Sequence, residues 1–141
     1  RGDCTVALVI CTLGDALLDV LVRTSEPLAP GADSPVETRL ETGGQAANVA
    51  AWVAELGEGA RCVAKRADDA AGALVATLLE RRGVELAGPV VAGTTGTVVA
   101  LVAPDGERTM ATDRGRTRGS RRWLTASSGA AGDGRARGRT S

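Results

Sequence analysis

The sequence predicts an α/β fold, with a parallel sheet beside a small antiparallel β subdomain. Short apolar runs rich in β-branched residues alternate with amphipathic helix patterns, as in a parallel sheet with crossover helices. An Asp-Gly turn then joins two β-rich runs, which is typical of a hairpin. The chain has 141 residues, enough for one domain with a hydrophobic core.

The first candidate strand is Thr5–Thr12, a continuous apolar run of the kind that is buried on both faces of a sheet. Residues 17–23 are a second, short extended candidate. Prolines and a glycine mark residues 26–34 as a loop. Residues 36–41 alternate apolar and polar side chains, which predicts a half-exposed strand.

A helix is predicted over residues 47–56, because Val49, Trp52, Val53 and Leu56 recur at helical spacing and a glycine follows. We expect these four side chains to face the core.

After a short buried strand at residues 60–64, a second helix is predicted over residues 69–82, with Asp69 as its N-cap. Its predicted buried face consists of Leu74, Val75, Leu78 and Leu79. The hairpin strands are residues 96–103 and 108–113.

Composition excludes several kinds of chemistry. The chain has no His, which rules out Ser-His-Asp and Cys-His catalysis and any His-ligated metal site. Cys4, Cys11 and Cys62 lack the paired spacing of a zinc site, and their apolar surroundings indicate buried, reduced thiols in a cytoplasmic protein. The apolar opening stretch is interrupted by Asp15 and Asp19, so no membrane span is expected there.

Two clusters carry chemical interest. Residues 14–19, Gly-Asp-Ala-Leu-Leu-Asp, place carboxylates after a buried strand, where α/β proteins bind ligands. Residues 43–48, Gly-Gly-Gln-Ala-Ala-Asn, enter a helix with a flexible glycine pair and an amide that can donate and accept hydrogen bonds. Taken singly, the first could equally be a solvated turn and the second an ordinary helix entry.

Together and in this order, the clusters resemble the N-terminal half of ribokinase-like (PfkB) sugar kinases. That family has a Gly-Asp/Ser-x-x-x-Asp turn, here Gly14–Asp19, and a Gly-Gly-x-x-x-Asn helix entry, here Gly43–Asn48. A later Gly-x-Asp-x-x-Gly turn matches Ala67–Gly72, with Ala67 in place of the usual Gly. The resemblance spans residues 5–115 and implies an incomplete ribokinase-like three-layer α/β domain with a small antiparallel β lid.

The resemblance implies a substrate-binding role for four residues. Asp19 would accept hydrogen bonds from sugar hydroxyls, Gly43 and Gly44 would bring the backbone close to the sugar, and Asn48 would bind a further hydroxyl. Gln45 stands where ribokinases often have Lys, which argues against ribose itself as the substrate. Which sugar or related alcohol binds is left open.

The implied activity is transfer of the ATP γ-phosphoryl group to a carbohydrate hydroxyl, with ATP and Mg²⁺ as cofactors. The family's catalytic Asp belongs to a late Gly-Ala-Gly-Asp motif, and nothing in residues 1–115 supplies it or an ATP site. Gly129–Asp133 imitates the motif but lacks a following helix pattern. We therefore expect no catalytic, cofactor-binding or metal-binding residue in this chain, and no kinase activity from the chain alone.

The sequence has two alternative interpretations of its function. One is a non-catalytic sugar-binding or dimerisation module, since the lid of this family often joins two subunits. The other is a Rossmann-type dinucleotide binder, which is disfavoured because no Gly-x-Gly-x-x-Gly follows the first strand.

The net charge of zero conceals a division. Residues 1–115 carry ten basic and sixteen acidic side chains, whereas residues 116–141 carry seven Arg and one Asp. We interpret residues 116–141 as a disordered Arg/Gly-rich tail, produced by a one-base frameshift near Gly115. The rival interpretation is a nucleic-acid-binding arm, but without interleaved aromatic side chains we do not expect nucleic acid as a partner.

Overall fold

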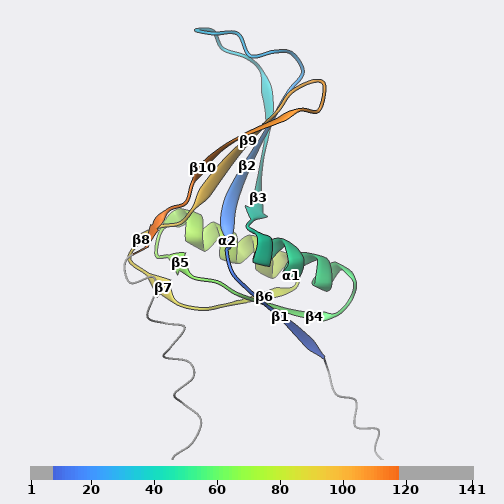
Figure 1. Cartoon of the computed structure of the whole chain (residues 1–141), viewed down its shortest axis with the longest axis vertical. Helices are drawn as coiled ribbons and strands as arrows, with labels where there is room; N and C mark the ends of the chain where they lie inside the picture. Colours follow the sequence, from blue (N-terminus) through green and yellow to red (C-terminus); the bar gives the residue numbers. More distant parts are fainter. Residues whose placement is uncertain (1–7, 118–141) are drawn as a thin grey trace, which may run out of the picture.

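The core sheet is parallel, as predicted. The computed structural model describes residues 8–117 (Figure 1). Its core sheet has the order β1-β4-β6, with all three strands parallel. The strands are β1 (Val9–Leu13), β4 (Gly59–Val63) and β6 (Val84–Ala87). The predicted α/β class is confirmed, and β6 is a strand that the sequence pattern did not reveal.

A second sheet rises from the core and is called the lid (Figure 1). Its strands are β2 (Leu17–Thr24), β3 (Val36–Gly43), β9 (Thr97–Val102) and β10 (Arg108–Asp113), in the order β10-β9-β2-β3. The β9–β10 hairpin is antiparallel, as predicted, and so is the β2–β3 pair, but the central β2–β9 pair is parallel. The sheet is mixed because both hairpins leave the core at the same end and lie side by side.

Helices α1 (Gln45–Glu55) and α2 (Ala70–Arg81) lie on the same side of the core sheet (Figure 1). Along β4, Ala60 and Cys62 are buried, whereas Arg61 between them is exposed and pairs with Glu85 of β6 at 2.7 Å. Because side chains alternate across a strand, the helices cover one face only. Within residues 8–117, two of the three predicted layers are therefore present.

Helix α2 matches its prediction. Asp69 caps it, and Asp69 Oδ1 accepts a hydrogen bond from the Gly72 amide at 2.8 Å. Val75 and Leu79 are fully buried, and Leu74 and Leu78 pack partly buried against the same core cluster.

The buried face of α1 was predicted wrongly. Alanines make the contact with the sheet, while Trp52 is 65% exposed and Leu56 is 80% exposed. The Thr12 hydroxyl of β1 donates to the carbonyl of Ala46 at 2.9 Å, so helix and sheet approach closely. Only small side chains fit at such a distance. Of the four predicted core residues, Val53 packs partly buried against the core cluster, whereas Val49, Trp52 and Leu56 are exposed. The buried alanines are Ala46, Ala47, Ala50 and Ala51.

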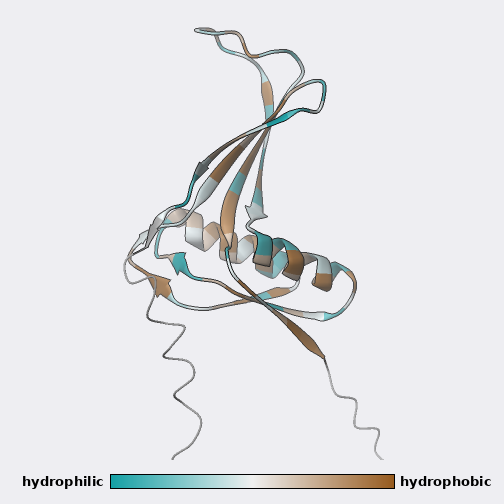
Figure 2. Ribbon diagram, in the orientation of Figure 1, coloured by the Kyte–Doolittle hydropathy of each residue, from teal (hydrophilic) through white to brown (hydrophobic). Residues whose placement is uncertain are grey.

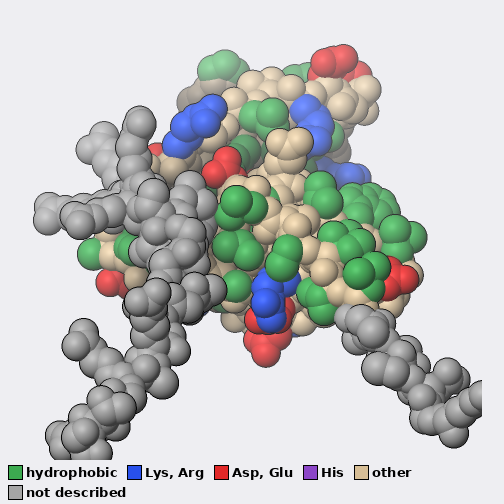
Figure 3. All heavy atoms as spheres, turned by 60° about the horizontal axis from the view of Figure 1, so that its bottom comes forward, with side chains coloured by type: hydrophobic (Ala, Val, Ile, Leu, Met, Phe, Trp, Pro, Cys, Tyr) green, Lys and Arg blue, Asp and Glu red, His purple; other side chains and the backbone are tan. Residues whose placement is uncertain are grey.

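Strand β1 is exposed rather than buried on both faces, which also corrects a prediction. Among the described residues, β1 pairs only with β4, and neither described helix covers the face that carries Val9, Cys11 and Leu13. Leu13 is 63% exposed. Strand β1 is hydrophobic (Figure 2), and hydrophobic side chains gather on the face of the molecule that Figure 3 shows. Cys11 is exposed for the same reason, whereas Cys62 is buried as predicted, and Cys4 lies outside the described residues.

Short strand pairs complete the described fold. They are β5 (Arg66–Ala67) with β7 (Val90–Val91), which run parallel, and β8 (Gly93–Thr94) with β11 (Arg116–Thr117), which run antiparallel. The described strands therefore include the first two residues of the predicted tail, whose remainder, 118–141, lies outside the described residues. No helix among residues 8–117 is long and apolar enough to span a membrane.

Candidate functional site

The candidate site lies where the lid joins the core. Strand β1 ends at Leu13, a turn follows, and β2 begins at Leu17. Strand β3 returns to the same place and ends at Gly43, directly before α1. The Gly14 amide donates to the carbonyl of Val63 at the end of β4 at 3.1 Å. Both predicted clusters are therefore brought together at one edge of the core sheet.

Asp19 and Gly43 are in direct contact. Leu17 pairs with Gly43 and Asp19 pairs with Glu41, so the Asp19 side chain lies on the same face of the lid as the Gly43 position. A Cβ atom at Gly43 would overlap the Asp19 carboxylate. Glycine is thus required here by space, not only by backbone flexibility.

The Asp19 carboxylate is incompletely paired. Its Oδ1 atom is buried and has no hydrogen-bond partner among residues 8–117. Burial raises the pKa of Asp19; the nearby Arg108 lowers this pKa, and Glu41 adds a further increase. A buried oxygen without a partner costs free energy in the free protein, and a ligand hydroxyl could recover that cost.

A second orphan oxygen belongs to a different environment. Thr42 is 6% exposed, and its Oγ1 atom also lacks a partner. Thr42 pairs with Leu18, so it lies on the opposite face of the lid from Asp19. We therefore do not include Thr42 in the candidate site.

The entry to α1 is fixed by the turn that follows β1. Gly44 has φ +94°, and a Cβ atom there would overlap the Asp15 carbonyl. That carbonyl accepts a hydrogen bond from the Ala47 amide at 3.4 Å, which satisfies one free donor of the first helical turn. The helix has no side-chain N-cap. Gly44 is therefore the residue that allows turn and helix to meet.

Asn48 follows in the first turn of α1. The backbone amide of Asn48 donates to the carbonyl of Gly44 at 3.0 Å, and Asn48 is exposed. Of the four predicted residues, Asp19, Gly43 and Gly44 are in contact or adjacent. Asn48 is connected to them through its backbone hydrogen bond to Gly44, and its side-chain amide is exposed to solvent.

A cavity of about 260 Å³ lies beside this junction. The end of β1, the turn at Gly14 and Asp15, and Gln45 and Val49 of α1 line it. The sequence patterns had singled out the turn and Gln45, but not Val49, because its side chain was expected in the core.

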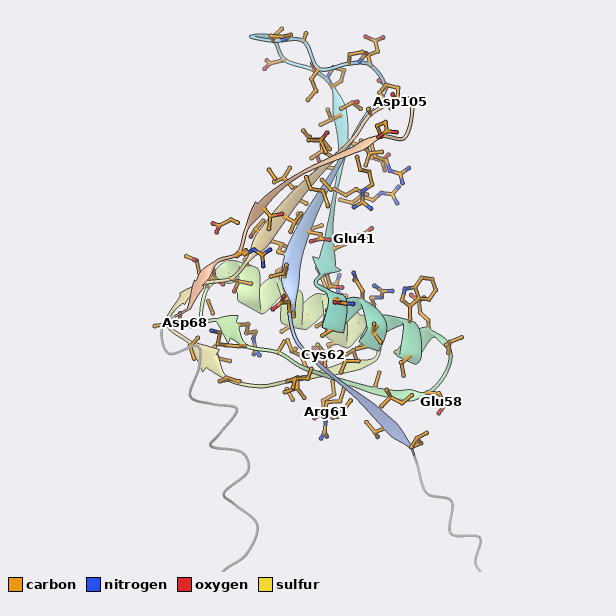
Figure 4. The ribbon with its side chains drawn as sticks, viewed as in Figure 1. Glu41, Glu58, Arg61, Cys62, Asp68 and Asp105 are labelled. Carbon is orange, nitrogen blue, oxygen red and sulfur yellow. The ribbon has the colours of Figure 1, made fainter. Side chains whose placement is uncertain are left out.

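Arg108 is the neighbour of Asp19 that sequence analysis missed. It lies on β10, far from Asp19 in the chain, and acts on the Asp19 carboxylate through its charge. Only the pairing of the two hairpins brings these side chains to one face of the lid. Glu41, on the adjacent strand, lies on the lid above α1 (Figure 4).

Comparison with known proteins identifies the family. The profile described as pfkB family carbohydrate kinase matches residues 8–125. The chain belongs to this family. The match includes both predicted clusters and confirms the resemblance inferred from them. None of the curated proteins matches the chain significantly.

Solved structures of pfkB-type kinases share the fold. A carbohydrate kinase from Agrobacterium tumefaciens is 30% identical with a TM-score of 0.62, and the match covers 74% of this chain and 35% of the kinase. The ribokinase of Thermotoga maritima is 26% identical with a TM-score of 0.62, and the match covers 77% of this chain and 37% of the ribokinase.

The Arabidopsis thaliana ribokinase, solved with ribose and ATP, is 26% identical with a TM-score of 0.61. The match covers 78% of this chain and 37% of the ribokinase. The chain therefore spans little more than a third of the length of these three relatives.

Proposed function

We propose that this chain carries the sugar-binding side of a pfkB family carbohydrate kinase. The observation that carries the proposal is the buried, unpartnered Oδ1 atom of Asp19, held against Gly43 at the junction of lid and core. A carboxylate that is fixed in place and lacks donors is suited to accept hydrogen bonds from the hydroxyls of a polyol.

The glycine pair and Asn48 supply the remaining contacts of the proposed site. A Cβ atom at Gly43 would overlap the Asp19 carboxylate and one at Gly44 would overlap the Asp15 carbonyl, so glycine at both positions keeps the proposed site in this shape. The exposed amide of Asn48 can both donate to and accept from a hydroxyl. Sugars and related alcohols present such hydroxyls in adjacent pairs, so this ligand class fits the donor set.

The activity proposed for the whole protein is transfer of the ATP γ-phosphoryl group to a hydroxyl of the bound sugar, in the cytoplasm. When bound, ATP with Mg²⁺ would supply the phosphoryl group and neutralise its charge. The described residues do not fit these cofactors. Within residues 8–117 no cluster of three or more His, Cys, Asp or Glu could hold a metal ion.

The starts of the two helices also provide no phosphate-binding site. A helix N-terminus can bind phosphate through its free amides. At α2 that position is occupied by the Asp69 carboxylate, and at α1 the Asp15 carbonyl already bonds to Ala47. We therefore derive no phosphoryl-transfer step for this chain and propose that alone it binds sugar without turnover.

Calorimetric titration of the chain with a panel of pentoses, hexoses and polyols tests the proposal. Saturable binding of at least one compound is expected, with affinity lowered by Asp19→Ala and by Asn48→Ala. The matched control is Asp33→Asn, an exposed loop carboxylate, which should leave the affinity unchanged. An ADP-release assay on the same samples should show no turnover. Binding that Asp19→Ala leaves intact contradicts the proposal.

A second candidate function is dimerisation through the lid. The face opposite Asp19 carries a group of apolar side chains, and Leu40 among them is 48% exposed. Its other apolar side chains, Val20, Val22, Val99 and Leu101, are only half-buried. Such a surface is typical of an interaction site. Light scattering on the chain and on Leu40→Lys tests it, since a lid dimer should dissociate in the variant.

A further inference from the structure

A hydrogen-bond network outside the proposed sugar contacts links α2 to the foot of the lid. Asp69 Oδ2 accepts from the amide of Thr95 at 2.8 Å, and Asp69 Oδ1 accepts from the Thr95 hydroxyl at 2.7 Å. The same Oδ1 accepts from the Gly72 amide at 2.8 Å. The Thr95 hydroxyl in turn accepts from the Ala67 amide at 3.1 Å. One carboxylate thus joins the start of α2 to the residues that lead into β9.

This network does more than cap a helix. An N-cap uses one side-chain oxygen to satisfy one amide of the first turn. Asp69 uses its second oxygen, and shares its first, for a residue 26 positions further along the chain. Thr95 is 6% exposed and Asp69 is partly buried, so these bonds are partly shielded from water, which strengthens them.

The network reaches the candidate site through the backbone. Thr95 is followed by Gly96, whose carbonyl accepts from the amide of Leu18 at 2.9 Å. Leu18 directly precedes Asp19, and β9 then pairs with β2 over its length. The position of Thr95 therefore determines where the β2 backbone that carries Asp19 begins.

Close packing leaves this region little freedom to shift. A Cβ atom at Gly72 would lie 2.8 Å from the Thr95 hydroxyl and would overlap the Ala67 carbonyl. A Cβ atom at Gly115 would overlap the Thr94 carbonyl and lie 2.6 Å from the Gly96 nitrogen. The foot of the lid cannot slide over α2 without breaking the bonds to Asp69.

We infer that Asp69 and Thr95 form a latch that fixes the foot of the lid on α2 and so positions Asp19 in the site. Both are positioning residues, since neither belongs to the proposed sugar contacts. The role in substrate positioning rests on the proposed function, whereas the latch itself is a property of the chain without ligand.

Hydrogen exchange of the full 141-residue chain without ligand tests the latch. Asp69→Ser keeps an oxygen to cap α2 but cannot bond to both donors of Thr95. Thr95→Val removes the hydroxyl and leaves the cap intact, and Thr95→Ser restores the hydroxyl. The matched control is Thr77→Val, which removes the hydroxyl bond to the Ala73 carbonyl on the exposed side of the same helix.

The latch predicts faster exchange in the lid only. In Asp69→Ser and Thr95→Val, the amides of Leu18 and of residues 97–99 should exchange about tenfold faster, as expected for losing about one net hydrogen bond. The amides of α2 should keep their protection. Thr95→Ser and Thr77→Val should match the unmodified chain in the lid.

Two results would overturn the inference. One is an unchanged exchange rate of the lid amides in Thr95→Val, which would show that Asp69 is an ordinary helix cap. If Asp69→Ser loses its helical circular dichroism, the result for Thr95→Val is used by itself. The other is global unfolding of Thr95→Val, because the latch is inferred to hold the lid and not the core.

Sugar affinity separates the latch from the proposed function. Where a sugar binds, Thr95→Val should weaken binding and Thr95→Ser should restore it. A chain that binds no sugar but shows the lid-specific exchange contradicts the proposed function and leaves the latch supported.

Discussion

The carboxylate of Asp19 occupies the space that a side chain at Gly43 would need. The two residues lie on neighbouring strands of the lid, directly before α1 begins. Their contact couples the shape of the backbone at the helix entry to the position of the carboxylate. Changes at either residue should therefore depend on the other.

A double-mutant cycle measures this coupling. Gly43→Ala should destabilise the chain by about 1–3 kcal/mol, because the added methyl group overlaps Asp19. In an Asp19→Ala background the same change should cost much less, since the carboxylate is gone. Urea unfolding of the four chains gives the coupling free energy. Additive costs would contradict the contact.

Asp19 should lower stability at neutral pH. Its folded pKa is raised above the ordinary 3.8, mainly by burial, so the folded chain binds more protons than the unfolded chain between these two values. Stability should therefore fall as the pH rises through the folded pKa.

The test is urea unfolding between pH 3.5 and about 8, a range that brackets ordinary and moderately raised carboxyl pKa values. Asp19→Asn should remove this loss and be more stable than the unmodified chain at pH 7. The control Asp33→Asn should keep the original pH dependence. A less stable Asp19→Asn chain at pH 7 would show that the carboxylate is structural.

Asp69 should act in the opposite direction. Burial would raise its pKa, but hydrogen bonds from Thr95 and the Gly72 amide outweigh burial and lower the pKa. The folded pKa lies below the unfolded value, so the stabilisation is present above the unfolded pKa and is lost as the pH falls through the folded pKa.

At neutral pH, Asp69→Ala should cost roughly 2 kcal/mol, the upper range for a lost cap. Below the folded pKa the difference from the unmodified chain should shrink, as measured by unfolding at a series of pH values. The control Asp105→Ala alters the turn at the far end of the β9–β10 hairpin (Figure 4) and should cost little. Equal losses in both variants would contradict the role of Asp69.

The exposed stripe of α1 should favour self-association rather than stability. Trp52 is 65% exposed and Leu56 is 80% exposed. The double variant Trp52→Gln, Leu56→Lys should reduce aggregation in light scattering and keep the helical circular dichroism. In contrast, Ala47→Leu should destabilise by about 1–3 kcal/mol, because Ala47 is fully buried. If the double variant unfolds, Trp52 and Leu56 contribute to the core, which contradicts their exposed positions.

Local patterns predicted what depends on neighbouring residues in the chain. The Asp69 cap, the buried face of α2 and the Asp-Gly hairpin are all set by spacing within one element, and the structure confirms them. The failure at α1 has a physical cause. Helical periodicity finds the largest apolar stripe, but contact with the sheet selects the smallest side chains, Ala47 and Ala50, where the backbones approach closely.

The remaining features depend on contacts between distant segments. The parallel pairing of β2 with β9 joins two hairpins about 80 residues apart, and the Asp69–Thr95 bonds bridge 26 residues. The charge of Arg108 reaches Asp19 only through that pairing. Motif order nevertheless indicated that the two clusters lie together, because they flank elements that meet at one edge of the sheet.

The most direct test of the account follows backbone amide resonances while a sugar from the calorimetric panel is added. The account predicts saturable shifts at residues 19, 43, 44 and 48, all absent in Asp19→Ala. Shifts confined to the far end of the lid, where Leu28 and Leu101 line a separate cavity, would contradict it.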